Sequence, residues 1–322
     1  MKKRVKSAII TATALIILGI VVSGLGFWGM GFNLRALNTE DMICTTFETT
    51  DAFRDISIET DIADLYFLAS EDGVCRVDCV DFANKTYAVN VKKGTLTIVK
   101  NDNRAWHENN GLAPIGEARV TVYLPEEKYA SLQIDENTGN IEMPSAFSFE
   151  QAMINTSTGG VYWFAPVSEK LSITSDTGDV EVRSTSPRSL ALKTDTGDIS
   201  ASEVQNTQQI YIETDSGKIE LINAGCMSLS ANSSTGDIAL KNVIANELLV
   251  IKNDTGVVVF DRSDAAEIYV QTDTGDVLGS LLSEKVFLTE TDTGDVDVPK
   301  SVTGGRCEIV TDTGDISITI QP

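Results

Sequence analysis

The amino-acid sequence predicts an all-β protein, a parallel β-solenoid (β-helix-like) of about ten regular coils of 19 or 20 residues each. The first observation is a glycine that recurs at this spacing, at Gly139, Gly159, Gly178, Gly197, Gly217, Gly236, Gly256, Gly275, Gly294 and Gly314. The second is an alternation of apolar residues on both sides of nearly every glycine, which is typical of short strands with one buried face. Self-similarity at a fixed period of this length indicates stacked repeats.

The repeated glycine is expected to form a tight turn. Asp-Thr precedes it in most repeats, and glycine reaches the φ > 0 region that such a turn requires. The Asp two positions before the glycine can accept a hydrogen bond from a nearby backbone N–H. We assign the turn-forming role to Gly178, Gly197, Gly217, Gly236, Gly256, Gly275, Gly294 and Gly314.

A meander of hairpins, each turning at Thr-Gly, would produce the same alternation of side chains. Stacked coils, in contrast, place equivalent Thr and Asp side chains in ladders about 4.8 Å apart. Stacking also explains why the repeat length varies by only one residue. The solenoid is therefore the favoured prediction.

The N-terminal segment is predicted to be a membrane element. Residues 1–6 include four basic residues and form the predicted cytoplasmic tail, whereas residues 7–32 carry no charge. This apolar run is long enough to supply the ~20 residues that span a bilayer, and the flanking basic residues indicate that the N-terminus stays inside. We expect one transmembrane helix in the cell membrane, with the C-terminal domain outside the cytoplasm. A cleaved signal peptide is the alternative.

Three regions follow this segment. Residues 33–52 are predicted to be a linker, residues 53–125 to be degenerate N-terminal β coils, and residues 126–322 to be the regular Asp-Thr-Gly-Asp array. In the degenerate region the repeat frame recurs at Ala63 and at Gly94, each with alternating apolar residues before and after it.

Composition and motifs argue against several classes of function. The net charge of −22 argues against binding to nucleic acid by phosphate neutralisation. A single histidine and the lack of a Cys-x-x-Cys pair give no zinc site. Asp-Thr-Gly also carries the catalytic aspartate of pepsin-like proteases, but those enzymes need two facing carboxylates that share a proton. The triplet recurs here at constant spacing, so we assign no catalytic residue and expect no enzyme.

The aspartates beside the repeated glycine raise the hypothesis of a calcium site. Unit charges stacked about 4.8 Å apart repel one another by about 0.9 kcal/mol in water, and bound Ca²⁺ would relieve this repulsion. Solvated turn acids are the simpler interpretation, so no cofactor is assigned. The metal candidates lie in the C-terminal coils, where the acidic positions are uninterrupted: Asp273, Asp276, Asp292, Asp295, Asp312 and Asp315.

Aromatic residues outside the core pattern are further candidates for ligand contact. Tyr211 and Tyr269 fall on the outward face of equivalent strands, and Trp106 and His107 lie in an insertion at residues 101–116. Such rings could contact a sugar or a protein. Ordinary strand propensity and packing explain them as well.

The sequence resembles a known bacterial family. The basic N-terminus, the apolar segment, the stretch "VTVYLPEEKYASLQIDENTGNIEM" and the repeated "TDTGDV" or "TDTGDI" are similar to the bacterial putative-adhesin proteins, which carry a β-strand-repeat domain of unknown function. The resemblance covers about residues 53–322. It implies a β-helix-like fold at the surface of the cell envelope, and it transfers no catalytic residue.

These observations predict a membrane-anchored, adhesin-like binding module of the cell surface, without catalysis. Its expected partners are the membrane, through the N-terminal helix, and an envelope protein or a surface glycan. A regulatory partner of an envelope-stress sensor in the same membrane is one alternative, and a calcium-stabilised structural protein is another. A polysaccharide-active enzyme on a parallel β-helix would need acids and basic residues clustered in a groove, and the few cations of the chain argue against it.

Overall fold

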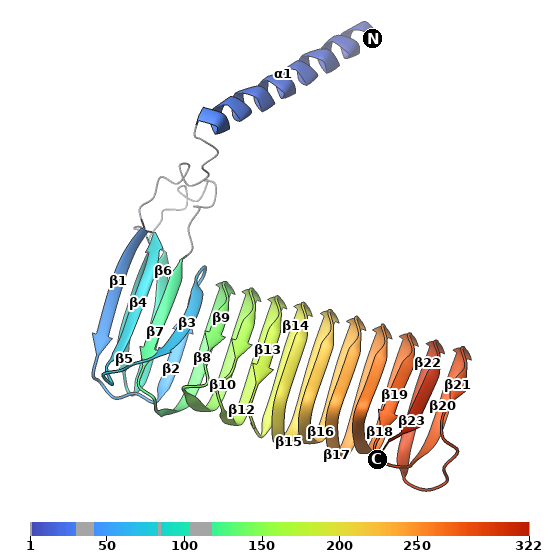
Figure 1. The fold of residues 1–322 in the computed structure, drawn as a ribbon. Coiled ribbons are helices and arrows are strands. Elements are labelled where there is room, and N and C mark those ends of the chain that lie inside the picture. The colour runs from blue at the N-terminus through green and yellow to red at the C-terminus, as the bar shows by residue number, and fades with distance from the viewer. Residues whose placement is uncertain (1, 30–41, 83–84, 103–117, 322) are drawn as a thin grey trace.

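The computed structural model describes residues 2–29, 42–82, 85–102 and 118–321. This part of the chain forms one helix, α1 (Lys2–Gly29), followed by 23 strands that belong to a single sheet. The sheet is wound into a rod, and the strands of successive coils lie side by side along it (Figure 1). They pair in parallel, so the predicted parallel β-solenoid of about ten turns is confirmed.

Each regular coil has a longer strand that ends at the glycine turn and a shorter strand that begins after it. In the middle of the rod, the shorter strand continues into the longer strand of the next coil. Equivalent apolar residues pair in register: Leu190 with Ile210, and Leu192 with Ile212. The strands are β8 (Lys128–Thr138), β9 (Ile141–Met143), β10 (Ser148–Thr158), β11 (Val161–Trp163), β12 (Val167–Thr177), β13 (Val180–Arg183), β14 (Ser189–Thr196), β15 (Ile199–Ser216), β16 (Ile219–Thr235), β17 (Ile238–Thr255), β18 (Val258–Thr274) and β19 (Val277–Leu281).

The glycine turn determines how closely successive coils approach. The repeat glycines have φ between 134° and 159°, a region that L side chains rarely adopt. The N–H of each glycine from Gly139 to Gly275 donates to the carbonyl before the next glycine in the stack, at 2.8 to 3.0 Å. A Cβ added to Gly197 would lie 2.2 Å from the carbonyl oxygen of Gly178. Only glycine therefore permits this stacking, and the predicted turn role of the repeat glycines agrees with this geometry.

A second corner follows six residues after the glycine, and other residue types occupy it. The residues there have φ between 51° and 55°: Ser184, Glu203, Asn223, Asn242 and Arg262. Asn tolerates this left-handed conformation better than most residues. The Asn223 amide donates to Glu203 Oε1 at 2.7 Å, and the Asn242 amide donates to Asn223 Oδ1 at 3.0 Å. Side-chain hydrogen bonds between neighbouring coils therefore stabilise this corner.

The first coils are not stacked in sequence order. β2 (Asp55–Glu59) pairs with both β6 (Thr95–Asp102) and β8, and β3 (Asp64–Ala69) pairs with both β7 (Arg119–Leu124) and β9. The coil of β6 and β7 is therefore outermost, although it is second along the chain. Ala63 stacks directly below Gly139, because a Cβ on Gly139 would lie 2.0 Å from the Ala63 carbonyl oxygen. The repeat frame predicted at Ala63 is confirmed.

The repeat frame predicted at Gly94 is wrong. β5 (Lys85–Lys92) and β6 form an antiparallel hairpin that turns at Lys93 and Gly94. Leu96 pairs with Ile56, so it is equivalent to a residue before a glycine turn rather than after one. The error has a physical cause: a hairpin and a coil place the same alternation of apolar residues around a glycine.

Three antiparallel strands close the N-terminal end of the rod. β1 (Met42–Thr49) pairs with β4 (Cys75–Phe82), β4 pairs with β7, and β5 pairs with β6. We call β1, β4 and β5 the N-terminal cap. Residues 33–52, which the sequence predicted to be a linker, therefore include a strand of this cap.

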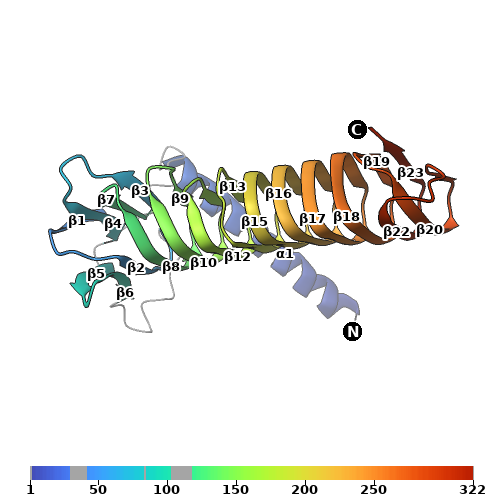
Figure 2. The same ribbon diagram turned by 90° about the horizontal axis from the view of Figure 1, so that it is seen from below.

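The last coils are also stacked out of sequence order. β22 (Gly305–Thr313) pairs with β18 on one side and with β20 (Lys285–Thr293) on the other. β23 (Ile316–Ile320) likewise lies between β19 and β21 (Val296–Asp297). The C-terminal segment is thus inserted one coil inside the rod, and residues 285–297 form its end (Figures 1 and 2).

The structure does not support the transmembrane part of the prediction. Among the described residues, no helix combines the length and the apolar character needed to cross a bilayer.

Candidate functional site

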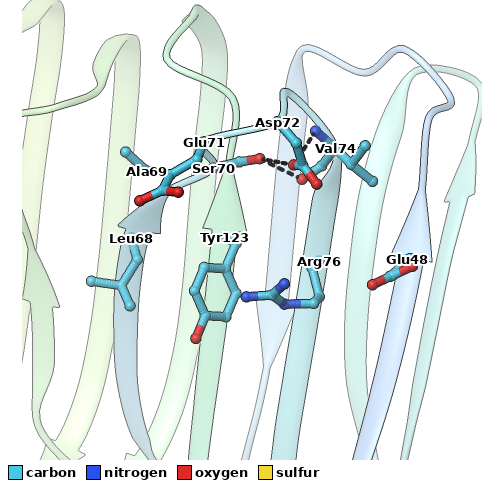
Figure 3. Close-up of a pocket in the computed structure, with 9 residues that line it drawn as sticks. All are labelled: Glu48, Leu68, Ala69, Ser70, Glu71, Asp72, Val74, Arg76 and Tyr123. Carbon is cyan, nitrogen blue, oxygen red and sulfur yellow. Dashed lines mark hydrogen bonds between the residues drawn. The ribbon is translucent and has the colours of Figure 1, made fainter.

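A groove lies on the outer face of the rod beside the N-terminal cap. Its volume is about 570 Å³, and it is lined by Glu48, Leu68, Ala69, Ser70, Glu71, Asp72, Val74, Arg76 and Tyr123 (Figure 3). The floor is a cross-strand row from β3, β7, β4 and β1. Leu68 pairs with Tyr123, Tyr123 with Arg76, and Arg76 with Glu48. We call this cavity the N-terminal groove.

Arg76 and Tyr123 form the centre of the floor. The guanidinium carbon of Arg76 lies 3.9 Å from the centroid of the Tyr123 ring, a distance typical of a cation–π contact. Arg76 Nε lies 3.5 Å from Asp78 Oδ2 on the same strand. These contacts hold both side chains in place, so the floor is preorganised.

The loop from Ser70 to Val74 forms one wall of the groove (Figure 3). Ser70 Oγ lies 2.8 Å from Asp72 Oδ1 and 2.8 Å from the Val74 carbonyl oxygen, and the Val74 N–H donates to Asp72 Oδ1 at 3.0 Å. The hydrogen bonds from Ser70 and from the Val74 N–H lower the pKa of Asp72. Asp72 is therefore ionised at neutral pH and gives this wall a negative charge.

A second row of side chains extends the surface of the N-terminal groove along the rod. Tyr162, Glu142, Tyr66, Thr121, Asp78 and Thr46 follow one another across β11, β9, β3, β7, β4 and β1. The two rows bring three tyrosines together with several carboxylates and one arginine. Tyrosine rings beside hydrogen-bond acceptors suit a ligand that has apolar faces and hydroxyl groups.

Sequence reasoning missed the N-terminal groove. All of its residues except Glu48 come from the degenerate region. There the apolar alternation of segments such as "DLYFLA" and "RVTVYL" was visible, but the antiparallel pairing that brings them together was not. The aromatic candidates Trp106 and His107 lie outside the described residues.

The predicted tyrosines Tyr211 and Tyr269 do not form a continuous site. They occupy equivalent outward positions, but Ser230 and Val250 lie between them in the stack. The Tyr211 hydroxyl bonds to Glu213, and the Tyr269 hydroxyl donates to Glu267 Oε2 at 3.1 Å. Each tyrosine is thus paired locally with an acid.

The aspartates that follow the glycine connect one coil to the next. The Asp198 N–H donates to Asp179 Oδ1 at 2.8 Å, and the Lys218 N–H donates to Asp198 Oδ1 at 2.7 Å. We call this series the acceptor ladder. Its other acceptors are Asp64, Asn140, Asp237, Asp276 and Asp315. These bonds, which are charge-assisted where the acceptor is an aspartate, each satisfy a backbone donor of the neighbouring coil.

The aspartates that precede the glycine have a different environment. All seven are exposed, and no described group hydrogen-bonds to them: Asp176, Asp195, Asp215, Asp254, Asp273, Asp292 and Asp312. The prediction that these residues accept a backbone hydrogen bond is wrong. The cause is the extended glycine turn, which directs the side chain after the glycine, rather than the one before it, toward the next coil.

Five of the six metal candidates fall into these two environments, and Asp295 takes part in the ladder through its backbone N–H. Asp276 Oδ1 accepts from the Asp315 N–H and Asp315 Oδ1 accepts from the Asp295 N–H, each at 2.8 Å. Asp273, Asp292 and Asp312 point into solvent on the other side of the turn. No group of three or more His, Cys, Asp or Glu side chains in the described chain is placed to hold a metal ion. The carboxylates of the acceptor ladder are engaged by backbone donors instead.

A buried polar row runs along the rod, three residues before each glycine. Thr194 Oγ1 donates to the Gly178 carbonyl, and Thr214 Oγ1 donates to the Gly197 carbonyl, both at 3.1 Å. Glu136 occupies the same position near the N-terminal end, where it is 4% exposed and neither carboxyl oxygen has a hydrogen-bond partner. Burial raises the pKa of Glu136 to about 8, and the nearby backbone N–H groups and Lys100 only partly oppose this.

We predict that the two aspartates of one turn contribute differently to stability. Asp198→Ala removes an acceptor from the Lys218 N–H and should lower the free energy of unfolding by about 1 kcal/mol. Asp195→Ala, the matched control, should change it by less than about 0.5 kcal/mol because its carboxylate is solvated. Urea unfolding of both variants measures the difference. Equal losses would show that the acceptor ladder does not stabilise the stack.

We predict that Glu136 makes stability depend on pH. Its pKa rises from 4.5 in the unfolded chain to about 8 in the folded one, so the folded state binds more protons between these values and loses stability as pH rises through this window. Glu136→Gln should therefore raise the melting temperature more at pH 9 than at pH 4. The exposed control Glu169→Gln should show no such trend. A pH-independent effect of Glu136→Gln would refute the assignment.

Three solved structures are similar to this chain at low sequence identity. A protein from Parabacteroides distasonis called a putative adhesin has a TM-score of 0.50 and 11% identity, over 88% of this chain and 98% of its own. A putative adhesin from Bacteroides fragilis has a TM-score of 0.37 and 14% identity, over 87% and 98%. A putative lipid binding protein from Parabacteroides distasonis has a TM-score of 0.42 and 16% identity, over 86% of this chain and 96% of its own. The likeness to the first of these proteins concerns the fold alone.

No curated protein matches the chain. The model of the Toastrack family DUF4097 matches residues 53–208 and again residues 203–322, which together span the solenoid. The chain therefore belongs to the Toastrack family DUF4097, in agreement with its resemblance to the bacterial putative-adhesin proteins.

Proposed function

We propose that the protein is an adhesin-like binding module of the cell surface, without catalysis, and that the N-terminal groove binds a neutral surface glycan. The observation that carries this proposal is the row of Leu68, Tyr123 and Arg76 under a walled cavity of about 570 Å³. A second arginine–tyrosine contact, between Arg306 and Tyr269 near the other end of the rod, is longer: the guanidinium carbon lies 5.4 Å from the ring centroid there and 3.9 Å from it in the groove.

The charges of the groove select the ligand class. Glu48, Glu71, Asp72 and Asp78 surround a single cation, Arg76. An acidic glycan would be repelled by this excess of carboxylates. A neutral sugar can place its apolar face against an aromatic ring and donate hydroxyl hydrogens to the carboxylates.

We also propose that the N-terminal segment attaches the protein to the cell membrane, with the solenoid on the outside. Residues 7–32 carry no charge and follow four basic residues. Nine large apolar side chains of α1 are between 49% and 69% exposed, so the described part of the solenoid does not cover them: Leu15, Ile16, Ile17, Leu18, Ile20, Val21, Val22, Leu25 and Trp28. A continuous apolar surface of this kind suits a lipid environment.

A regulatory partner in the same membrane is the second candidate function. The groove lies at the end of the rod where the chain enters it through β1, and only residues 30–41 separate α1 from that strand. An anchored protein would therefore hold the groove close to the membrane surface. That position favours a ligand or protein of the same envelope over one on a distant surface.

We predict that Tyr123→Ala weakens the binding of chitotetraose, a neutral oligosaccharide, at least tenfold, which corresponds to about 1.4 kcal/mol. The reason is the loss of the aromatic floor. Isothermal titration of the full chain in detergent measures the affinity, and Tyr211→Ala, an exposed tyrosine outside the groove, is the control. Equal affinity of the Tyr123 variant and the parent would exclude the groove. Absence of binding at millimolar sugar, with cross-links from the groove to a membrane protein in cells, would favour the second candidate.

A further inference from the structure

The two ends of the rod differ in how they are closed. At the N-terminal end, the cap pairs with the outermost coil and completely buries its inward residues, Leu96, Ile98, Val120 and Val122. At the other end, β20 pairs only with β22, and β21 pairs only with β23. The outer edge of both strands therefore presents backbone N–H and C=O groups that have no strand partner in the described chain (Figure 1).

The hydrophobic core is also open at this end. We call the outermost coil, residues 285–304, the C-terminal tip. Phe287 and Val298 are only partly buried, and Val296 is 45% exposed, whereas Ile316, which pairs with Val296, is 0% exposed. Terminal coils of solenoids usually need a polar cap, and unpaired strand edges are sites of association. In the described chain, no cap covers the tip and no strand pairs with its outer edge.

We propose that the C-terminal tip binds the tip of a second copy of the chain and forms a two-fold symmetric dimer. A two-fold axis relates identical strands in opposite directions, so β20 of one copy can pair antiparallel with β20 of the other. This pairing satisfies the open backbone edge and covers Phe287, Val296 and Val298 with the same residues of the second copy.

The shape of the tip favours a second copy over a single peptide. β20, β21 and the return segment at residues 298–304 together surround the opened core. An extended peptide could pair with one of these three sides. The same coil of a second copy has a matching cross-section and can cover all three sides and the core between them. Residues 285–304 supply about 20 residues per side, which is within the range of a specific protein interface.

The charges of the tip are compatible with the antiparallel arrangement. Asp292 lies near the end of β20, whereas Arg306, ion-paired with Glu308, lies at the start of β22 beside the beginning of β20. Lys300 lies in the return segment, and Glu284 and Glu290 are further exposed acids of this end. Antiparallel pairing brings Asp292 of one copy to the side of the tip on which Arg306 lies in the other. The cap buries the core at the opposite end of each rod, so in the described chain this apolar contact is available at one end, and association through it stops at two copies.

The dimer has a consequence that depends on the membrane attachment proposed above. It places the two N-terminal segments at opposite ends of a doubled rod. Such an assembly joins two membranes, which is a geometry for adhesion between cells.

Sedimentation equilibrium of the full chain in detergent tests the dimer. We expect a micromolar dimer that Val296→Lys weakens at least tenfold, because a charge then faces the opened core. Met153→Lys is the matched control, since Met153 is 42% exposed on a middle coil and should leave the dimer unchanged. A monomeric parent chain at 100 micromolar, or an intact dimer in the Val296 variant, would overturn the proposal.

Distances between spin labels locate the interface independently, because the N-terminal helix could also associate. The labels are introduced in a Cys44→Ser background, which removes the one exposed thiol among the described cysteines. One variant carries the label at Leu288 in the tip, and a separate variant carries it at Thr46 in the cap. We expect short intermolecular distances for the Leu288 label and none for the Thr46 label. Short distances for Thr46, or none for Leu288, would contradict a tip-to-tip dimer. These results do not depend on whether the groove binds a sugar.

Discussion

The stacking of the glycine corners is the constraint on which the rest of the structure depends. A Cβ built on any repeat glycine would lie only 1.9 to 2.2 Å from the carbonyl oxygen of the corner residue in the neighbouring coil. This contact keeps the coils in register, so the apolar rows close into one core and the Asp198 carboxylate meets the N–H of the next coil. The acceptor ladder, the buried polar row and the second corner all follow from the same register.

Regular stacking also explains where function can reside. The middle coils repeat the same surface positions, and their polar groups form hydrogen bonds with one another or with the solvent. The repeat is interrupted only at the two ends of the rod. There the chain leaves its sequence order, antiparallel strands assemble the N-terminal groove at one end, and an unpaired edge remains at the other. Both proposed binding surfaces therefore lie where the coil pattern breaks.

The sequence predicted the parts of the fold that have a periodic signal. The glycine spacing and the apolar alternation predicted the solenoid and the core positions, and Ala63 was correctly placed despite its missing glycine. Gly94 was misplaced because local alternation does not distinguish a hairpin from a coil. The order of β20 and β22 in the stack was not predictable. Both strands carry the same repeat pattern, so either of them could pair with β18. The groove was missed because Arg76 and Tyr123 are distant in sequence and meet only through antiparallel pairing.

A comparison of Gly197→Ala with Gly73→Ala tests the central constraint most directly. Both glycines have positive φ, but a Cβ on Gly73 meets no atom within 4 Å, whereas one on Gly197 meets the Gly178 carbonyl. Urea unfolding should show a loss of about 1 kcal/mol for Gly73→Ala, from backbone conformation alone. It should show a loss of about 3 kcal/mol or more for Gly197→Ala. Equal losses would mean that close stacking at the corner does not determine the fold.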